Sequence, residues 1–452
     1  MTTRARALCF LQSILATGHC SLIHKDHLGR MLPRCTTLAL VEGFTMTVEI
    51  GQYLGQDGVW LKNNHTRLFI QKFGGMTPEF SSLCQLDDST QWVNTHWNPH
   101  FKSPFSGKLN PASQEQHSYW GIELMRQAAG TFPCAPTFGP GNSELLPHGD
   151  TANMDWQLED AQQTKSGQQE AVYAHWKLTG NYQGLHYRKW DILPASSSTH
   201  YMVLEVVNPS KQNIEINLAW HTTLGATFLE RGCLIETNCN QFKTAPSGTE
   251  FDHTSALKSG AEFTSLSEAP DSQSNHRKTK DVSTMPGYNG HSEFISGVTD
   301  HSRYLWSVCI NPYLRMAYLT LVPFDAIERQ ANASSMNYWM HSGGRDFTPW
   351  ADYQGGVDRN YALGMETSIG ASCLGLDWAR KHPKYLGKPT YRTLAAGTSL
   401  RFPCINTIFE VDLTTSTDKQ QQRKSIHQQV ERHISTLDTR FSVFTTLTQK
   451  DD

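Results

Sequence analysis

Residues 214–221 read Ile-Glu-Ile-Asn-Leu-Ala-Trp-His, in which bulky apolar side chains occupy every second position. Successive side chains of a β-strand point to opposite faces, so this period of two predicts a half-buried strand. Trp220 falls on the apolar face, and His221 falls on the other face, away from the main core. The residues after His221 are mostly small, which leaves space beside its imidazole. The simpler alternative is a solvent-facing histidine at the end of a strand.

The same period recurs along the chain and indicates an all-β protein. Further strands are expected at residues 67–73, 171–178, 186–192, 200–207, 303–310, 316–322 and 399–413. Turn-rich segments separate them, and there is no regular alternation of strands with helices that would favour a parallel sheet. We therefore expect a large antiparallel β-sandwich.

Composition divides the chain into three parts. Residues 1–45 form an N-terminal extension, which is either a poor signal peptide or a segment upstream of a natural start at Met46. Residues 46–415 form the sandwich, with a surface insertion expected at 244–297, where Ser, Thr, Gly and charged residues dominate. Residues 416–452 hold a short helix and a tail.

The C-terminal helix has a capping residue and one apolar face. Asp418 can cap its first turn. Four apolar residues then follow at the spacing of one helical face, namely Ile426, Val430, Ile434 and Leu437. We expect this face to pack on the sandwich.

Charge and cysteine content narrow the classes of partner. The 452 residues contain 39 Lys and Arg against 42 Asp and Glu, so there is no basic field for nucleic acid or for an anionic membrane surface. No apolar run approaches the roughly 20 residues that span a bilayer. Ten scattered cysteines without a CxxC pair favour reduced thiols in the cytoplasm, although a signal peptide would make the protein periplasmic or secreted. A small-molecule partner and a monomer or homodimer are expected.

A second strand supports a cleft independently of the first. In residues 361–366, Tyr361, Leu363 and Met365 form the apolar face. Glu366 then shares the opposite face with two minimal residues, Ala362 and Gly364. Such a surface is typical of the floor of a binding cleft, and a glycine kink or bulge is the alternative.

Several short motifs follow one another in an order that resembles the aldose 1-epimerase family. They are Gly74-Gly75-Met76, His148-Gly149, Asn208 with the strand leading to His221, Gly343-Gly344 and Gly364-Met365-Glu366. The likeness spans residues 50 to 410 or so and rests on order and spacing. The surroundings of His221, the long insertion and Met365 depart from the best-known galactose mutarotases, so the chain resembles a poorly characterised branch.

The resemblance implies a galactose mutarotase-like supersandwich that interconverts sugar anomers by acid–base ring opening. It implies that Glu366 is the base for the O1 proton, that His221 is the acid for the ring oxygen and that His148 helps to hold the ring. Ordinary pKa values, about 4.3 for Glu and 6.5 for His, would suit these roles. No cofactor is implied.

Substrate-binding residues are expected at four further positions. Arg126 lies near the place where the family carries a binding arginine, although an exposed ion pair is an equal alternative. Asn208 belongs to the motif order given above. Asp346 is one of three aspartates in the loop before Glu366, and Trp350, with Trp97 and Trp339, is a candidate stacking platform or a core residue.

Other functions on the same fold have to be weighed. A non-catalytic carbohydrate-binding module, a sugar-phosphate epimerase and a lyase-like enzyme are the alternatives. Arg188, Lys189 and Arg345 are candidates for phosphate binding, without forming a cluster. His96 and His100 have metal-ligand spacing for a helix, but Pro99 disfavours one there, so we expect no metal.

Overall fold

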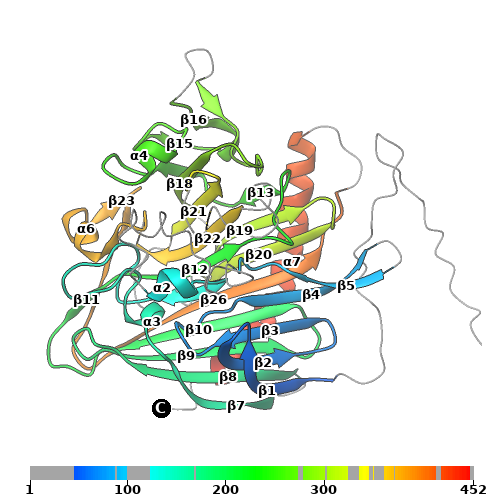
Figure 1. Cartoon of the computed structure of the whole chain (residues 1–452), viewed down its shortest axis with the longest axis vertical. Helices are drawn as coiled ribbons and strands as arrows, with labels where there is room; N and C mark the ends of the chain where they lie inside the picture. The colour runs from blue at the N-terminus through cyan, green and yellow to red at the C-terminus, as the bar shows by residue number, and fades with distance from the viewer. Residues whose placement is uncertain are drawn as a thin grey trace, which may run out of the picture.

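The computed structural model describes residues 45–86, 89–98, 123–166, 169–272, 278–300, 303–323, 335–345, 350, 361–370, 372–413 and 419–447. In these ranges the chain forms three large antiparallel sheets (Figure 1). The predicted antiparallel β-sandwich is thereby confirmed. The expected N-terminal extension, apart from Thr45, lies outside the described residues.

Two of the sheets form the sandwich. The eight-stranded sheet has the order β13 (Leu234–Thr237), β19 (Tyr304–Asn311), β20 (Met316–Pro323), β26 (Ser399–Glu410), β10 (Thr199–Val207), β9 (His186–Pro194), β8 (Gln169–Thr179) and β7 (Gln157–Ser166). The seven-stranded sheet has the order β15 (Glu262–Phe263), β14 (Gln241–Thr244), β18 (His291–Val298), β21 (Ser335–Ser342), β22 (Ala362–Ile369), β12 (Leu218–Leu224) and β6 (Thr131–Cys134). The main core lies between them, and Trp220 of β12 donates its indole N–H to the Phe402 carbonyl of β26 over 3.1 Å.

The third sheet is an N-terminal meander at one end of the sandwich. Its strands are β1 (Thr47–Tyr53), β2 (Gln56–Lys62), β3 (Thr66–Gln71), β4 (Glu79–Leu86) and β5 (Ser89–Asn94). Strands β1 and β2 contact β7 and β8, and Leu61 and Leu68 join the main core with Val172 of β8 (Figure 1).

Short elements complete the described chain. The helices are α2 (Glu123–Gln127), α3 (Asp150–Asn153), α4 (Phe251–Thr254), η3 (Leu266–Glu268) and α6 (Gly375–Lys381). Three strand pairs stand apart from the large sheets, namely β11 (Ile214–Ile216) with β25 (Arg392–Leu394), β16 (Ala269–Pro270) with β17 (Thr279–Lys280), and β23 (Lys384–Tyr385) with β24 (Lys388–Pro389).

The segment 214–221 keeps its predicted faces but is not one strand. It divides at Asn217, whose backbone N–H donates to the Pro136 carbonyl and whose side-chain oxygen accepts from the Phe138 N–H over 2.7 Å. Strand β11 therefore pairs with β25, whereas β12 enters the seven-stranded sheet. Side chains still alternate between the two faces after the break, because Trp220 is fully buried in the core and His221 lies on the outer face.

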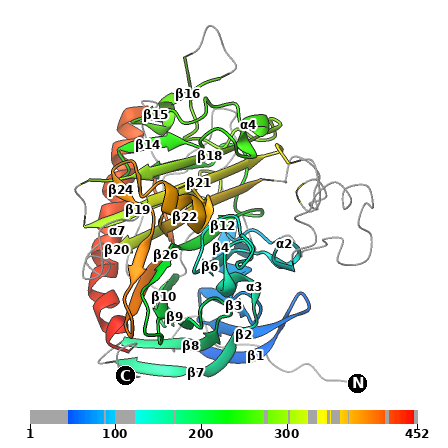
Figure 2. The same cartoon turned by 90° about the vertical axis from the view of Figure 1, so that its left-hand side faces the viewer.

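The range expected for the insertion, 244–297, extends too far. Residues 291–298 form β18, which pairs with β14 and β21 inside the seven-stranded sheet. Ile295 of this strand is fully buried in the main core. The segment rich in polar residues thus ends before His291, and the remainder carries α4, β15, η3, β16 and β17 above the sheet (Figure 2).

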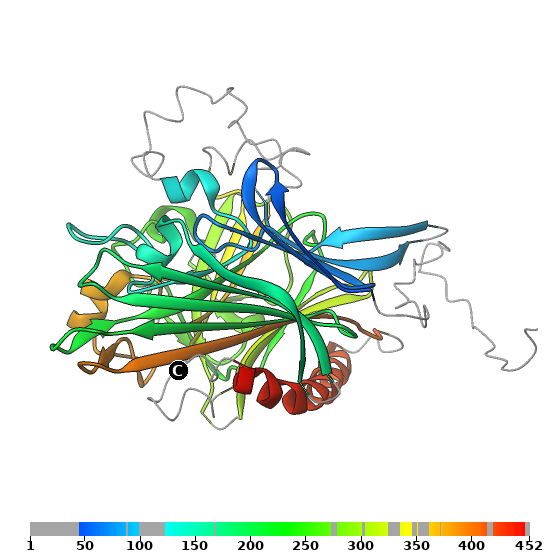
Figure 3. The ribbon, with the colours of Figure 1, turned by 90° about the horizontal axis from the view of Figure 1, so that it is seen from below.

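The C-terminal helix α7 (Lys419–Leu447) covers the outer face of the eight-stranded sheet. Figures 2 and 3 show it running along the outside of the long strands. The four predicted contact residues, Ile426, Val430, Ile434 and Leu437, are each at most 2% exposed and pack with Trp306, Ile310 and Leu319. The predicted packing face is confirmed, and Asp418 lies outside the described residues.

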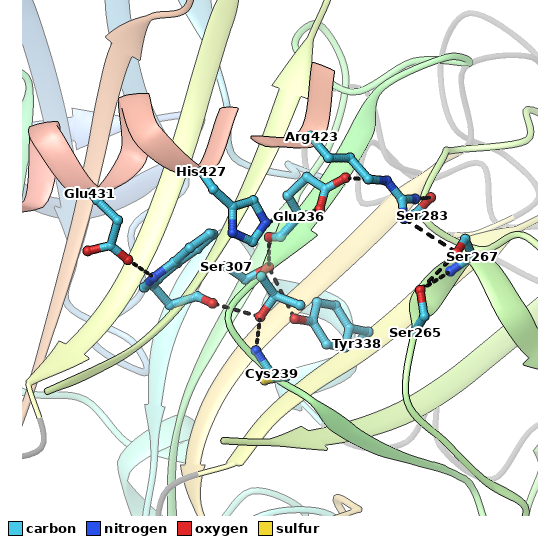
Figure 4. Close-up of polar contacts among 12 residues, drawn as sticks. Glu236, Cys239, Ser265, Ser267, Ser283, Ser307, Tyr338, Arg423, His427 and Glu431 are labelled. Atoms are coloured by element: carbon cyan, nitrogen blue, oxygen red, sulfur yellow. Dashed lines mark hydrogen bonds and ion pairs between the residues drawn. The ribbon is translucent and has the colours of Figure 1, made fainter. Parts of the chain in front are cut away.

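A polar ridge on α7 lies beside this apolar face. Arg423 and His427 contact the two carboxylate oxygens of Glu236 in β13 at 2.9 and 3.3 Å, and Trp306 donates its indole N–H to Glu431 over 3.1 Å (Figure 4). These contacts hold the helix in register on the sheet. Among the described residues, no helix is long and apolar enough to cross a membrane.

Candidate active site

Five side chains form a row across the outer face of the seven-stranded sheet. Phe132 lies opposite His221, Glu366 lies opposite Asn337, and Asn337 lies opposite Ser296. Strands β12 and β22 pair in one register on either side of His221 and Glu366, so these two residues also face each other. Because side chains of a sheet alternate between faces, all five point away from the main core.

His221 and Glu366 are in direct contact. The Nε2 atom of His221 lies 3.2 Å from Oε1 of Glu366, and Nδ1 of His221 is 3.0 Å from the Thr223 hydroxyl. The side chains are 14% and 1% exposed. The second carboxyl oxygen of Glu366, Oε2, is buried without a hydrogen-bond partner among the described residues. An unpaired buried polar atom of this kind is uncommon in folded proteins.

Burial changes the acid–base character of both groups. It raises the pKa of Glu366 to about 8, although the Arg345 charge acts in the opposite direction. It also holds the pKa of His221 well below the usual histidine value, with a further lowering from His148. Desolvation disfavours the charged form of each group, so at neutral pH the site holds a carboxylic acid next to a neutral imidazole. The ordinary pKa values expected from the sequence are therefore not found.

His148 lies next to this pair. Its ring is perpendicular to that of His221, with centroids 5.0 Å apart, and Phe132 stacks on His221 at 4.6 Å. Nδ1 of His148 is 3.4 Å from the thiol of Cys134, and burial lowers the pKa of His148 to about 4. His148 has a positive φ of 63°, which a non-glycine residue rarely adopts. Its backbone is thus bent in a way that is common near functional sites.

Gly364 allows the Glu366 carboxyl to reach its position. A Cβ atom on Gly364 would lie 2.7 Å from Oε1 of Glu366 and 3.1 Å from Cβ of Trp339. The absence of a side chain at Gly364 therefore leaves room for the Glu366 carboxyl in the position that it takes. The neighbouring Ala362 is fully buried on the same face.

A cavity of ≈320 Å³ opens above these residues. His148, His221, Thr223 and Glu366 line it from one side. Much of the remaining lining is apolar and comes from residues 124–132, 139–147, 245–251 and 372–374, and from Phe294 of β18. Its size lies at the lower end of the range for small-molecule sites.

Three tryptophans and one ion pair also line the cavity. Trp97 stacks on Trp350 with ring centroids 4.5 Å apart, and Trp339 meets Trp350 edge-on at 5.0 Å. The Arg345 guanidinium lies over the Trp339 and Trp350 rings at 4.8 and 5.0 Å. It also forms two contacts with the Glu250 carboxylate, at 2.6 and 3.2 Å.

The expected substrate-binding residues have different outcomes. Trp350 lines the cavity. Arg126 belongs to α2, but its side chain lies outside the described residues, as does Asp346 as a whole. Asn208 is not in the cavity. Its amide donates to the Gln212, Leu394 and Ala395 carbonyls, and its oxygen accepts from Ser210, so its role is to hold a turn.

The residues considered for phosphate or metal binding are paired with other groups of the protein. Lys189 is buried against Asp191 at 2.6 Å, and Arg188 pairs with Glu205, both in the eight-stranded sheet. His96 is fully buried between the Thr77 carbonyl at 2.6 Å and the Tyr318 hydroxyl at 3.0 Å. Within the described ranges there is no group of three or more potential metal ligands.

Sequence reasoning missed Phe132, Glu250 and Cys373 as lining residues. They come from separate parts of the chain, and each stands in a segment without a distinctive local pattern. Arg345 was considered only for phosphate binding. Its proximity to Gly343-Gly344 was the one signal that could have placed it at the site.

The fold resembles that of known structures, whereas comparison of the sequence with family models and with curated proteins gives no match. No family model and no curated protein matches the chain. A "putative aldose 1-epimerase" from Klebsiella pneumoniae is 12% identical, with 86% of this chain and 87% of that chain covered and a TM-score of 0.57. A galactose mutarotase-like protein from Clostridium acetobutylicum is 10% identical, with 81% and 99% covered and a TM-score of 0.48. The first similarity establishes a mutarotase-like fold.

Proposed function

We propose that the protein is an aldose 1-epimerase-like isomerase that interconverts the two anomers of an aldose. The observation that carries the proposal is the direct contact of His221 and Glu366 at the cavity, which both residues line. An acid and a base that lie in one cavity and differ in proton affinity are what ring opening requires.

In the proposed reaction the sugar O1–H loses its proton to the base, the bond between C1 and the ring oxygen breaks, and that oxygen takes a proton from the acid. The open-chain aldehyde rotates about C1–C2, and the reverse steps close the ring on the other face. Bonds and protons balance without a cofactor. His148 is proposed to hold the ring oxygen or a neighbouring hydroxyl.

The pair needs only one proton for this cycle. At neutral pH that proton resides on Glu366, because burial raises its pKa to about 8. In that state Glu366 is the acid and His221 is the base, and the roles implied by the family resemblance require a prior proton transfer across the 3.2 Å contact, against the difference in pKa. The same cycle run backwards exchanges the two roles.

The test is anomer exchange on a panel of aldoses, followed by saturation-transfer NMR with the uncatalysed rate subtracted. Wild type should exchange at least one sugar, and Glu366→Gln and His221→Gln should each reduce the rate at least 100-fold. Glu79→Gln is a matched control, since Glu79 is equally buried but belongs to the N-terminal sheet. Binding without exchange would instead identify a carbohydrate-binding module.

A further inference from the structure

The hydroxyl of Thr223 lies within hydrogen-bond distance of the reactive histidine. Its Oγ1 atom is 3.0 Å from Nδ1 of His221, whereas the other ring nitrogen, Nε2, contacts Glu366. Thr223 is 2% exposed and lines the cavity. A hydroxyl can donate or accept, so the direction of this hydrogen bond depends on which ring nitrogen of His221 carries the proton.

The sheet holds the Thr223 side chain in place. The Thr223 N–H donates to the Gly130 carbonyl over 3.1 Å, and the Thr223 carbonyl accepts from the Trp97 N–H over 2.9 Å. Thr223 and His221 are two residues apart on β12, so both side chains project from the outer face. Threonine also branches at Cβ, which restricts its rotamers. The hydroxyl is therefore fixed beside the imidazole.

The carboxyl group of Glu366 indicates which ring nitrogen is protonated. Burial raises the pKa of Glu366 to about 8, so at neutral pH one of its two oxygens carries a proton. Among the described residues Oε2 has no partner, whereas Oε1 lies 3.2 Å from Nε2 of His221. A proton on Oε1 thus has an acceptor within reach, and a proton on Oε2 would be a buried donor without one, which is unfavourable. This comparison places the proton on Oε1 and leaves Nε2 bare to accept it.

The one proton of the neutral imidazole is then on Nδ1. A neutral histidine carries a single N–H, so a bare Nε2 requires a protonated Nδ1. The Thr223 oxygen, 3.0 Å away, is an acceptor for that N–H. If the threonine donated instead, Nδ1 would have to be bare, and Nε2 would point its own N–H at the protonated carboxyl.

We propose that Thr223 is a positioning residue that accepts the Nδ1–H of His221 and so keeps Nε2 bare opposite Glu366. The inference rests on the proposed function for the reaction that the pair carries out. His221 enters that reaction as the base, through Nε2. When Nε2 takes a proton from Glu366 or from the sugar, the ring becomes an imidazolium, and its Nδ1–H bond to Thr223 becomes charge-assisted and stronger. Thr223 thus acts on the reaction through His221.

The neighbouring residue Thr222 offers a matched control. It belongs to the same strand and is fully buried, but its side chain points to the opposite face. Its hydroxyl accepts from the Thr131 hydroxyl over 3.3 Å. Valine in place of either threonine keeps the branched shape and removes one hydroxyl, so each variant loses a buried hydrogen bond. Only Thr223→Val loses one to His221.

The first experiment observes the tautomer of His221 without any ligand. The protein is labelled with ¹⁵N-histidine, and His221→Gln assigns the two ring nitrogens among the twenty histidines, because protonated and bare nitrogens resonate far apart. At neutral pH, wild type, Thr223→Ser and Thr222→Val should show a protonated Nδ1 and a bare Nε2. In Thr223→Val the tautomer ratio should move about tenfold toward Nε2–H, the value of one hydrogen bond. The ring also bonds to the backbone oxygen of His221 itself, which these substitutions do not remove.

The second experiment measures anomer exchange on the aldose that wild type exchanges fastest. Thr223→Val should lower kcat about tenfold and change KM less than about twofold, because it weakens the acid–base group and leaves the sugar contacts in place. Thr223→Ser keeps the hydroxyl and should restore kcat to within about threefold of wild type. Thr222→Val should change both constants less than about twofold, since its lost bond lies on the other face.

Several results would overturn the inference. A bare Nδ1 in wild type would refute the direction of the hydrogen bond, and this measurement stands even if Thr223→Val does not fold. An unchanged tautomer ratio in Thr223→Val, an equal loss of kcat in the two valine variants, or no recovery in Thr223→Ser would refute the positioning role. In each case exchange by wild type leaves the proposed isomerase intact. The expected tautomers without exchange of any aldose by wild type would refute the isomerase and leave the hydrogen bond to Thr223 standing.

Discussion

His221 on β12 and Glu366 on β22 face each other across neighbouring strands, with Nε2 3.2 Å from Oε1. Burial shifts their pKa values in opposite directions, so that Glu366 keeps its proton to about pH 8 while His221 stays neutral far into acid. Between these limits the pair holds one proton.

The rate of the proposed anomer exchange should depend on pH through the loss of this single proton. We expect kcat/KM for anomer exchange to be flat through neutral pH and to fall about tenfold per pH unit above pH 8, where the pair loses its acid. Saturation-transfer NMR from pH 5 to 9.5 measures the profile. A midpoint near pH 4.5 with no alkaline fall would mean that Glu366 titrates as an ordinary carboxylate.

The same pKa predicts a pH-dependent cost in stability. Between pH 4.5 and 8 the folded protein binds more protons at Glu366 than the unfolded chain, so the free energy of unfolding decreases as pH rises. The lowered pKa of His221 has the opposite effect on the free energy of unfolding, but only below about pH 6.5, the pKa of histidine in the unfolded chain. From pH 6.5 to 9, wild type should therefore lose about 2 kcal/mol relative to Glu366→Gln in urea unfolding. A constant difference would contradict the raised pKa.

Gly364→Ala should impair the reaction more than the fold. The new Cβ would meet the Glu366 carboxyl at 2.7 Å, and a flexible side chain can move away from it. We expect at least a tenfold loss in anomer exchange with a loss in unfolding free energy of about 1 kcal/mol. Gly51→Ala is the control, since that site on β1 has open space around it and should leave both quantities unchanged.

Asn208→Ala should destabilise the protein without weakening substrate binding. Its amide serves three backbone carbonyls, and their loss should cost about 2–4 kcal/mol in chemical unfolding. KM for anomer exchange should not change. An increase in KM without loss of stability would restore Asn208 to the substrate site, and the exposed Asn213→Ala is the comparison.

Ile434→Ala tests how far α7 stabilises the sandwich. Ile434 is 2% exposed and packs with residues of the eight-stranded sheet, so its truncation should cost about 2–4 kcal/mol. Ser435→Ala on the exposed face should cost less than about 0.5 kcal/mol. Equal unfolding free energies of the two variants would show that the packing of α7 contributes little to the stability of the sandwich.

The strands were predictable because burial on one face imposes a period of two on the sequence. That period also placed His221 and Glu366 on the outer face, even though Asn217 interrupts the strand. The helix face was predictable from the spacing of Ile426, Val430, Ile434 and Leu437.

The floor of the cleft was predicted, but its walls were not predictable, because they depend on contacts between distant segments. Nothing near Trp97 in the sequence indicates that it will stack on Trp350, and nothing near Glu250 indicates Arg345. The raised pKa of Glu366 follows from burial by those same segments. Asn208 was wrongly expected to bind substrate, because an asparagine that holds a turn and one that binds a ligand can have the same local sequence.

The two halves of the cavity differ in how closely they are tied to the sheet. Its floor consists of neighbouring strands, where a single added methyl group on Gly364 already collides with the reactive carboxyl. Glu250 and Phe251 belong instead to a segment between β14 and β18 that lies above the sheet. Under the proposed function, exchange of that segment should change which sugar is preferred and leave His221 and Glu366 in place.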